Sequence, residues 1–130
     1  MAESSAPLFA NSDLLVNAMG RWPSFHDAKV KNVVREGDSC RAQLNVFEMT
    51  NKVDSNGYFV LTKHHLVTIQ MSGIKECTLP ENYGGDVLSS LSAEREGTLV
   101  RVVFDSVIDP NLRWHCLCGE AKVVSCTPTA

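Results

Sequence analysis

The segment that most restricts the fold is residues 40–46, where apolar and polar side chains alternate without a break. The apolar positions are Cys40, Ala42, Leu44 and Val46, and the polar positions between them are Arg41, Gln43 and Asn45. Because successive side chains of a strand point to opposite faces, this period of two predicts a strand with one buried and one solvated face. An antiparallel sheet that is covered on one side accommodates such strands.

Further strands are predicted around turn signals. Asn56-Gly57 is a turn signal, and residues 51–57 are expected to form the loop before a long strand over residues 58–71. That run is rich in β-branched and aromatic residues, but its apolar side chains change parity along the run. The change predicts either burial on both faces or a bulge near residues 63–65. After a break at Gly73, residues 74–79 are expected to form the antiparallel partner of this strand.

The C-terminal part of the chain also has strand character. Residues 99–107 form a predicted strand that ends in a type I turn at Asp109-Pro110-Asn111. Residues 112–126 are expected to form the last strand, with a bulge or bend at Gly119. One face of this strand would carry Trp114, Cys116 and Cys118.

Two short helices are predicted beside the strands. Ser12 can cap a helix over residues 12–19, and Gly20 suits the left-handed position that follows it. The apolar residues of this helix at helical spacing are Leu14, Leu15, Ala18 and Met19. Asp86 can cap the second helix, whose buried stripe would consist of Val87, Leu88 and Leu91.

Strands therefore dominate, no βαβ alternation occurs, and the connections are short. The sequence predicts an α+β fold, predominantly antiparallel β, in which a curled sheet, a sandwich or a partial barrel carries two short helices. A length of 130 residues fits a single domain. Residues 1–11 are expected to be a flexible N-terminus, and residues 12–130 are expected to form the β-rich domain.

Charge and composition limit the function classes. Twelve Lys and Arg residues oppose fifteen Asp and Glu residues, and the net charge of −3 offers no basic excess for nucleic-acid binding. No stretch reaches the ~20 consecutive apolar residues of a membrane-spanning helix. Residues 1–13 lack a basic segment followed by an apolar core, so no secretory signal is predicted. The five cysteines are expected to be free thiols in a cytoplasmic protein.

The most unusual local sequence runs from Trp22 to Ala28, where two aromatic residues flank a proline and an adjacent His26 and Asp27 follow. Such a pair could be acid–base partners or metal ligands. Neighbours on a strand point to opposite faces, however, so the two side chains converge only if a turn lies between them. The favoured interpretation is structural: aromatic anchors hold the helix on the sheet, and the polar pair satisfies backbone groups. The motif residues are Trp22, Pro23, Phe25, His26 and Asp27.

The other histidines and the cysteines suggest a zinc hypothesis. The residues concerned are His64, His65, His115, Cys116 and Cys118. Structural zinc needs four convergent nitrogen or sulfur ligands, usually in two knuckles, and the sequence offers no second knuckle. Buried thiols are the favoured interpretation. No nucleophile elbow, HExxH helix or phosphate-binding loop is present. We therefore predict no catalytic, metal-binding or cofactor-binding residues, and we do not expect an enzyme.

Residues 22–30 read WPSFHDAKV, which resembles the W-P-S-F-H-D-A-E-V signature of the Immunity protein 50 family of bacterial polymorphic toxin systems. The similarity continues through HHLVTIQMSGI, YGGDVLSSL and CGEAKVVSCTP, and Lys29 stands where the signature has glutamate. The resemblance implies a cytoplasmic antidote that binds the effector domain of a cognate toxin without catalysing a reaction. It assigns no toxin-contacting residue and no oligomeric state.

Two other functions remain open. A barrel-like protein could hold a small molecule in a cavity lined by Trp22, Phe25, Phe47, Tyr58 and Phe104. A metal-dependent hydrolase could use His26, Asp27, His64 or His115, provided that at least three of these side chains converge. For the toxin-binding hypothesis, we expect the recognition surface on solvent-facing loops and strands and not on residues 22–28.

Overall fold

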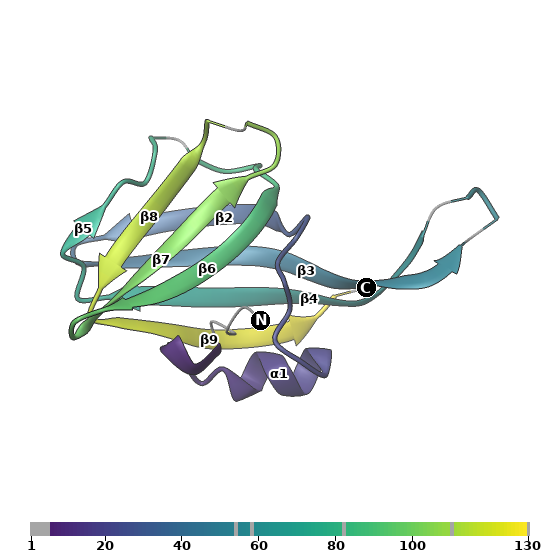
Figure 1. The fold of residues 1–130 in the computed structure, drawn as a ribbon, viewed down its shortest axis with the longest axis horizontal. Helices are drawn as coiled ribbons and strands as arrows, with labels where there is room; N and C mark the ends of the chain where they lie inside the picture. Colours follow the sequence, from purple (N-terminus) through teal and green to yellow (C-terminus); the bar gives the residue numbers. More distant parts are fainter. Residues whose placement is uncertain (1–5, 54, 58, 82, 110, 130) are drawn as a thin grey trace.

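The computed structural model describes residues 6–53, 55–57, 59–81, 83–109 and 111–129, which form two β-sheets that face each other (Figure 1). The five-stranded sheet has the order β1-β9-β4-β3-β2, built from β1 (Phe9–Ala10), β9 (Glu120–Pro128), β4 (Phe59–Ser72), β3 (Ser39–Val53) and β2 (Lys29–Glu36). The four-stranded sheet has the order β5-β8-β7-β6, built from β5 (Glu76–Cys77), β8 (Arg113–Cys118), β7 (Leu99–Ser106) and β6 (Leu88–Glu96). All pairs are antiparallel except β1 with β9. The predominantly antiparallel β prediction is confirmed, and neither sheet closes into a barrel.

The first predicted helix is present as α1 (Asp13–Met19). Gly20 adopts the left-handed conformation with φ of 84°, and its backbone N–H donates to the carbonyl of Val16 at 2.8 Å. This bond ends the helix in the way that the sequence predicts. Ser12 occupies the N-cap position, although its side chain makes no capping hydrogen bond.

The second predicted helix is wrong, because the residues that follow Asp86 form strand β6. The register between β6 and β7 shifts between Leu88 and Ser90, which inserts one extra residue into β6. The insertion brings Leu88 and Leu91, three positions apart, to the same buried face. A β-bulge thus produced the spacing that resembled a helix. Among the described residues, α1 is the one α-helix, accompanied by the short 3₁₀ helix η1 (Ala6–Leu8).

The long strand predicted over residues 58–71 corresponds to β4, with Tyr58 outside the described residues. Of the two alternatives predicted for the change of parity, the bulge is present, because the β3–β4 register shifts where Val46 pairs with His65 and Glu48 pairs with Thr62. The loop predicted over residues 51–57 is too long, because β3 continues to Val53. The two strands therefore form a long hairpin that extends past the rest of the fold (Figure 1).

Two pairings differ from the prediction. The partner of β5 is β8, in the other sheet, and not β4: Cys77 lies opposite Cys116. The segment predicted as one last strand is divided at Gly119 into β8 and β9, which belong to different sheets. The Gly119 backbone N–H lies 3.0 Å from the carbonyl oxygens of both Ser72 and Gly73, and these contacts fix the crossover. The predicted turn at residues 109–111 includes Pro110, which lies outside the described residues. The Asp109 carboxylate accepts a hydrogen bond from the Asn111 N–H at 2.9 Å.

Residues 6–11, which belong to the stretch expected to be flexible, take part in the fold, and residues 1–5 lie outside the described residues. Phe9 and Ala10 pair in parallel with Ala121 and Lys122 of β9, and Phe9 is buried. The 3₁₀ helix η1 contacts β6, and α1 contacts β9. The N-terminal segment thus contacts β9 of the five-stranded sheet through β1 and α1, and β6 of the four-stranded sheet through η1.

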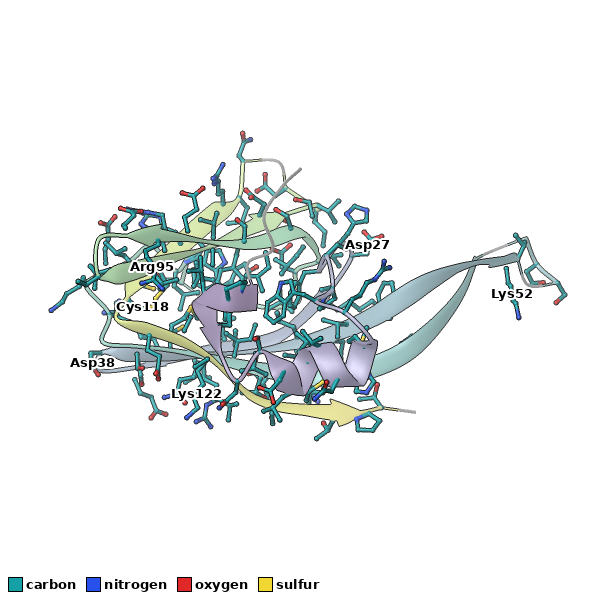
Figure 2. The ribbon with its side chains drawn as sticks, turned by 60° about the horizontal axis from the view of Figure 1, so that its bottom comes forward. Asp27, Asp38, Lys52, Arg95, Cys118 and Lys122 are labelled. Carbon is teal, nitrogen blue, oxygen red and sulfur yellow. The ribbon has the colours of Figure 1, made fainter. Side chains whose placement is uncertain are left out.

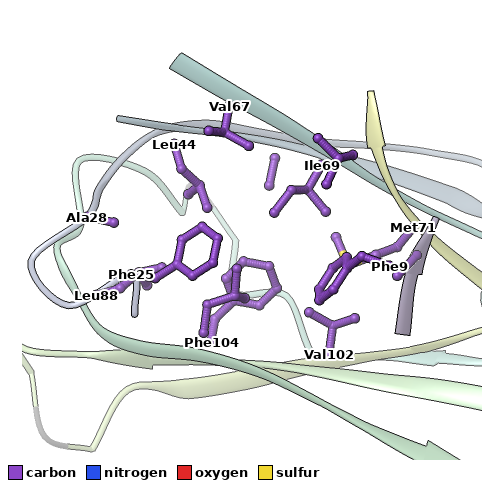
Figure 3. Packing of buried hydrophobic residues seen from close by; sticks show 14 of the residues in the cluster. Phe9, Phe25, Ala28, Leu44, Val67, Ile69, Met71, Leu88, Val102 and Phe104 are labelled. Carbon is purple, nitrogen blue, oxygen red and sulfur yellow. The ribbon is translucent and has the colours of Figure 1, made fainter. Parts of the chain in front are cut away.

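Apolar side chains from both sheets meet between them to form the core. Figure 3 shows three of these side chains: Leu44 of β3, Phe25 of the segment before β2, and Phe104 of β7. The Phe104 and Trp114 rings stack with centroids 4.0 Å apart. Trp114, Cys116 and Cys118 lie on one face of β8, as predicted, and all three are buried. In the part of the chain that is described, no helix is long and apolar enough to cross a membrane.

Candidate binding groove

The segment from Trp22 to Ala28, here called the corner, connects the two sheets. The Asp27 N–H donates to the carbonyl of Leu88 at 2.8 Å, and the Leu88 N–H donates to the carbonyl of Ala28 at 2.8 Å. A further bridge joins Lys29 to Val87. These bonds connect the start of β2 in one sheet to the start of β6 in the other. Backbone hydrogen bonds therefore attach the corner to both sheets.

Two non-glycine residues of the corner adopt the left-handed conformation: φ is 62° at Phe25 and 64° at Asp27. Such conformations are unfavourable for residues with a side chain and persist where the surroundings impose them. Here Phe25 is 2% exposed and its ring lies 5.5 Å from that of Trp22, which in turn lies 5.1 Å from Phe9. This aromatic row joins the N-terminal segment to the corner.

The left-handed turn also changes where His26 and Asp27 point. On a regular strand the two side chains would lie on opposite faces, and they could converge only if a turn lay between them. The left-handed conformation of Asp27 provides this turn, and His26 Nε2 lies 3.5 Å from Asp27 Oδ2. His26 Nδ1 lies 3.3 Å from the carbonyl oxygen of Ser89. The imidazole is 60% exposed and the carboxylate 38% exposed, so both groups are accessible from solvent.

Two surface hollows adjoin at the corner, and both are lined by Asp27 and Phe47. The first, of about 400 Å³, is lined by Met19, Arg21, Trp22, Pro23, Ser24, His26, Asp27 and Phe47. The second, of about 500 Å³, is lined by Asp27, Lys29, Asn45, Phe47, His64, Val87 and Thr129. We call the two together the corner groove. The Phe47 ring lies 5.8 Å from the His64 ring, at the root of the long β3–β4 hairpin.

The histidines proposed for metal chemistry are only partly brought together. His26 and His64 line different hollows of the corner groove, with Asp27 shared between them. His115 lies on the four-stranded sheet, where its Nε2 is 2.9 Å from Glu76 Oε1. Within the described residues, no group of three or more His, Cys, Asp or Glu side chains is placed to hold a metal ion.

The five cysteines, all described, are free thiols. Burial raises the pKa of Cys40 to about 11. A hydrogen bond with Cys118, together with burial, raises the pKa of Cys116 far above its usual value, and the same bond lowers the pKa of Cys118. The Cys118 thiol also approaches the carbonyl of Val100 at 3.5 Å. Cys40 and Cys116 are therefore neutral thiols at physiological pH, which are poor metal ligands and poor nucleophiles.

The sequence analysis missed Asn45 and Thr129 as lining residues of the groove, and it considered Phe47 only for an internal cavity. A signal for Phe47 existed: the buried side chains of the alternating segment stand at even positions, so position 47 falls on the solvated face. A large aromatic residue on that face is a candidate for contact with a ligand or partner.

The fold and the groove define a two-sheet β-sandwich with an open hollow of mixed aromatic and charged lining where the sheets are joined. No family model, no curated protein and no solved structure matches this chain.

Proposed function

We propose that this chain is a non-catalytic, cytoplasmic immunity protein that binds the effector domain of a cognate toxin and neutralises it. The corner groove is the observation that carries the proposal. It combines aromatic surface from Trp22 and Phe47 with charged groups of both signs, supplied by Arg21, Asp27 and Lys29. Aromatic and arginine side chains in a concave site are the residue types that anchor protein interfaces.

The rigidity of the corner supports the same proposal. Asp27 lines both hollows, and its backbone is hydrogen-bonded to Leu88 in the other sheet. A binding surface held in this way loses little conformational entropy when a partner docks. The proposed surface includes the corner itself, which revises the expectation that recognition would avoid residues 22–28.

The proposal predicts that a toxin effector domain is encoded immediately upstream of the gene for this chain, and this domain is the partner for the experiment. Purified chain is titrated with that domain in a calorimeter, and we expect an equimolar complex. Because Phe47 lines both hollows, Phe47→Ala should weaken binding by about tenfold or more. Val34→Ala is the control, since Val34 is an exposed apolar residue of the five-stranded sheet that does not line the groove. Equal affinities of wild-type protein and Phe47→Ala would contradict the groove as the contact surface.

A small-molecule function is the second candidate, favoured by the second hollow alone. Its volume of about 500 Å³ lies within the range of ligand pockets, and its lining combines polar side chains with the apolar Phe47 and Val87. Of the aromatic residues first considered for an internal cavity, Phe25 and Phe104 are buried in the core, while Trp22 and Phe47 line the groove. A metabolite library screened by thermal shift distinguishes the two candidates. A small-molecule ligand would raise the melting temperature of wild-type protein and not that of Phe47→Ala.

A further inference from the structure

Two cysteines lie directly opposite each other on neighbouring strands of the four-stranded sheet. Cys77 of β5 pairs with Cys116 of β8 in an antiparallel register. One step along this ladder, the Thr78 N–H donates to the carbonyl of His115 at 2.9 Å, so that position is hydrogen-bonded. Because hydrogen-bonded and non-hydrogen-bonded pairs alternate along an antiparallel ladder, Cys77 and Cys116 form a non-hydrogen-bonded pair.

Non-hydrogen-bonded pairs bring the two backbones of a ladder closest together. Their Cα atoms lie about 4.5 Å apart, and disulfides join residues whose Cα atoms are about 4.4–6.8 Å apart. The two side chains also share a face, because Cys116 is buried in the core and Cys77 packs against the same core. A disulfide between them therefore requires no change of strand register.

The ionisation of Cys116 is independent evidence that the thiols are close. Its pKa is raised by a hydrogen bond with Cys118, by burial and by the nearness of the Cys77 thiol. Cys116 thus has two sulfur neighbours, of which one lies on its own strand and the other directly across the ladder.

The two cysteines of the pair differ in their access to solvent. Cys116 is fully buried, whereas Cys77 is only partly buried. Strand β5 consists of two residues at the edge of its sheet, and among the described strands it pairs with β8 alone. Such short elements with few contacts open locally at a small cost in free energy. A small reagent can therefore reach Cys77, while Cys116 stays shielded from it.

We propose that Cys77 and Cys116 are a reversible dithiol–disulfide pair that exchanges with a low-molecular-weight disulfide. The Cys77 thiolate attacks one sulfur of the small disulfide, which forms a mixed disulfide and releases one small thiol. Cys116 then loses its proton and attacks the Cys77 sulfur, which forms the internal disulfide and releases the second small thiol. In the net reaction, two protein thiols are oxidised and the small disulfide is reduced to two thiols, which take up both protons.

The buried state of Cys116 determines the order of the two steps. A neutral, buried thiol is a poor nucleophile toward a free reagent in solution. In the second step, however, the sulfur that Cys116 attacks is held directly opposite it on β5, and such proximity raises the effective concentration of the reacting groups.

The internal disulfide would attach the edge strand β5 covalently to β8. It closes a long loop, from residue 77 to residue 116, and so restricts the unfolded chain. We expect oxidised protein to melt about 10 °C above reduced protein. Figure 2 shows Cys118, the neighbour of the pair on β8, far from Asp27 of the corner groove. The inference is therefore independent of the toxin-binding proposal, and it is measured on the purified chain alone.

The test is treatment of the purified, folded chain with oxidised glutathione. We expect wild-type protein to lose two of its five free thiols, and non-reducing peptide mass spectrometry to link Cys77 to Cys116. Dithiothreitol should restore both thiols. Cys77→Ser should form no internal disulfide, and its melting temperature should be the same with and without treatment. Cys126→Ser is the matched control, because Cys126 is also a partly buried thiol but lies on β9, and it should form the disulfide as wild-type protein does.

Circular dichroism confirms that each variant is folded before treatment. Wild-type thiols that stay unmodified would overturn the proposal. So would a glutathione adduct of Cys77 that never gives way to the internal disulfide, or a disulfide that links Cys77 to Cys40 or Cys118. A Cys77–Cys116 disulfide that lowers the melting temperature would contradict its formation in the native register.

Discussion

Replacement of Phe25 by alanine is expected to lower the free energy of unfolding by about 3–5 kcal/mol, as for other fully buried aromatic residues. The Phe25 side chain is 2% exposed and belongs to the core between the two sheets. Alanine adopts the left-handed conformation no more readily than phenylalanine, so the backbone strain stays and the loss of packing decides the result. Trp22 is only half-buried, and its truncation should cost less.

Equilibrium unfolding in urea measures this effect, and His26→Ala is the matched control one residue away. His26 is exposed, so its replacement should change the free energy of unfolding by less than about 0.5 kcal/mol. If Phe25→Ala unfolds at the same urea concentration as wild-type protein, the ring does not anchor the corner in the core.

The second large effect is expected for Asp86→Ala, at about 3 kcal/mol of lost stability. Asp86 is 7% exposed, and its carboxylate accepts hydrogen bonds from the Ser106 hydroxyl at 2.6 Å, the Tyr83 hydroxyl at 2.7 Å and the Val87 N–H at 2.9 Å. Truncation leaves these part-buried donors without their acceptor, and such groups are costly to leave unpaired. The loss of these hydrogen bonds would weaken the junction between the segment before β6 and the end of β7.

Asp109→Ala is the control for this prediction, because the exposed Asp109 carboxylate accepts one hydrogen bond, from the Asn111 N–H. We expect it to cost less than about 1 kcal/mol in the same urea titration. The spectroscopic titration of Tyr83 gives a second measurement. Burial, together with the Asp86 carboxylate, raises the pKa of Tyr83 above its usual value, and Asp86→Ala should lower it. Equal stability of the two variants would show that the Asp86 network contributes little.

Local patterns predicted most of the strands, because each strand has to bury one face. The alternation in residues 40–46 and the glycine after α1 depend only on neighbours in sequence, and both predictions are confirmed. The helix predicted after Asp86 failed because the bulge in β6 gives Leu88 and Leu91 a spacing of three. The pairing of β5 with β8 and of β1 with β9 depends on residues that are distant in sequence, and no local pattern contains that information.

The candidate site was less predictable than the fold for a similar reason. The unusual composition of the corner identified it, but the approach of His26 to Asp27 depends on a left-handed residue that is not glycine. The groove also needs Phe47 and His64 from the β3–β4 hairpin, and only the folded sheet brings them to the corner.

The most direct test of the proposed binding function is growth of bacteria that express the upstream-encoded toxin domain together with this chain. Wild-type protein and the surface control Val34→Ala should restore growth, whereas Phe47→Ala, verified as folded and equally abundant, should protect poorly. Continued growth arrest in the presence of abundant, folded wild-type protein would contradict the proposal that this chain neutralises a toxin.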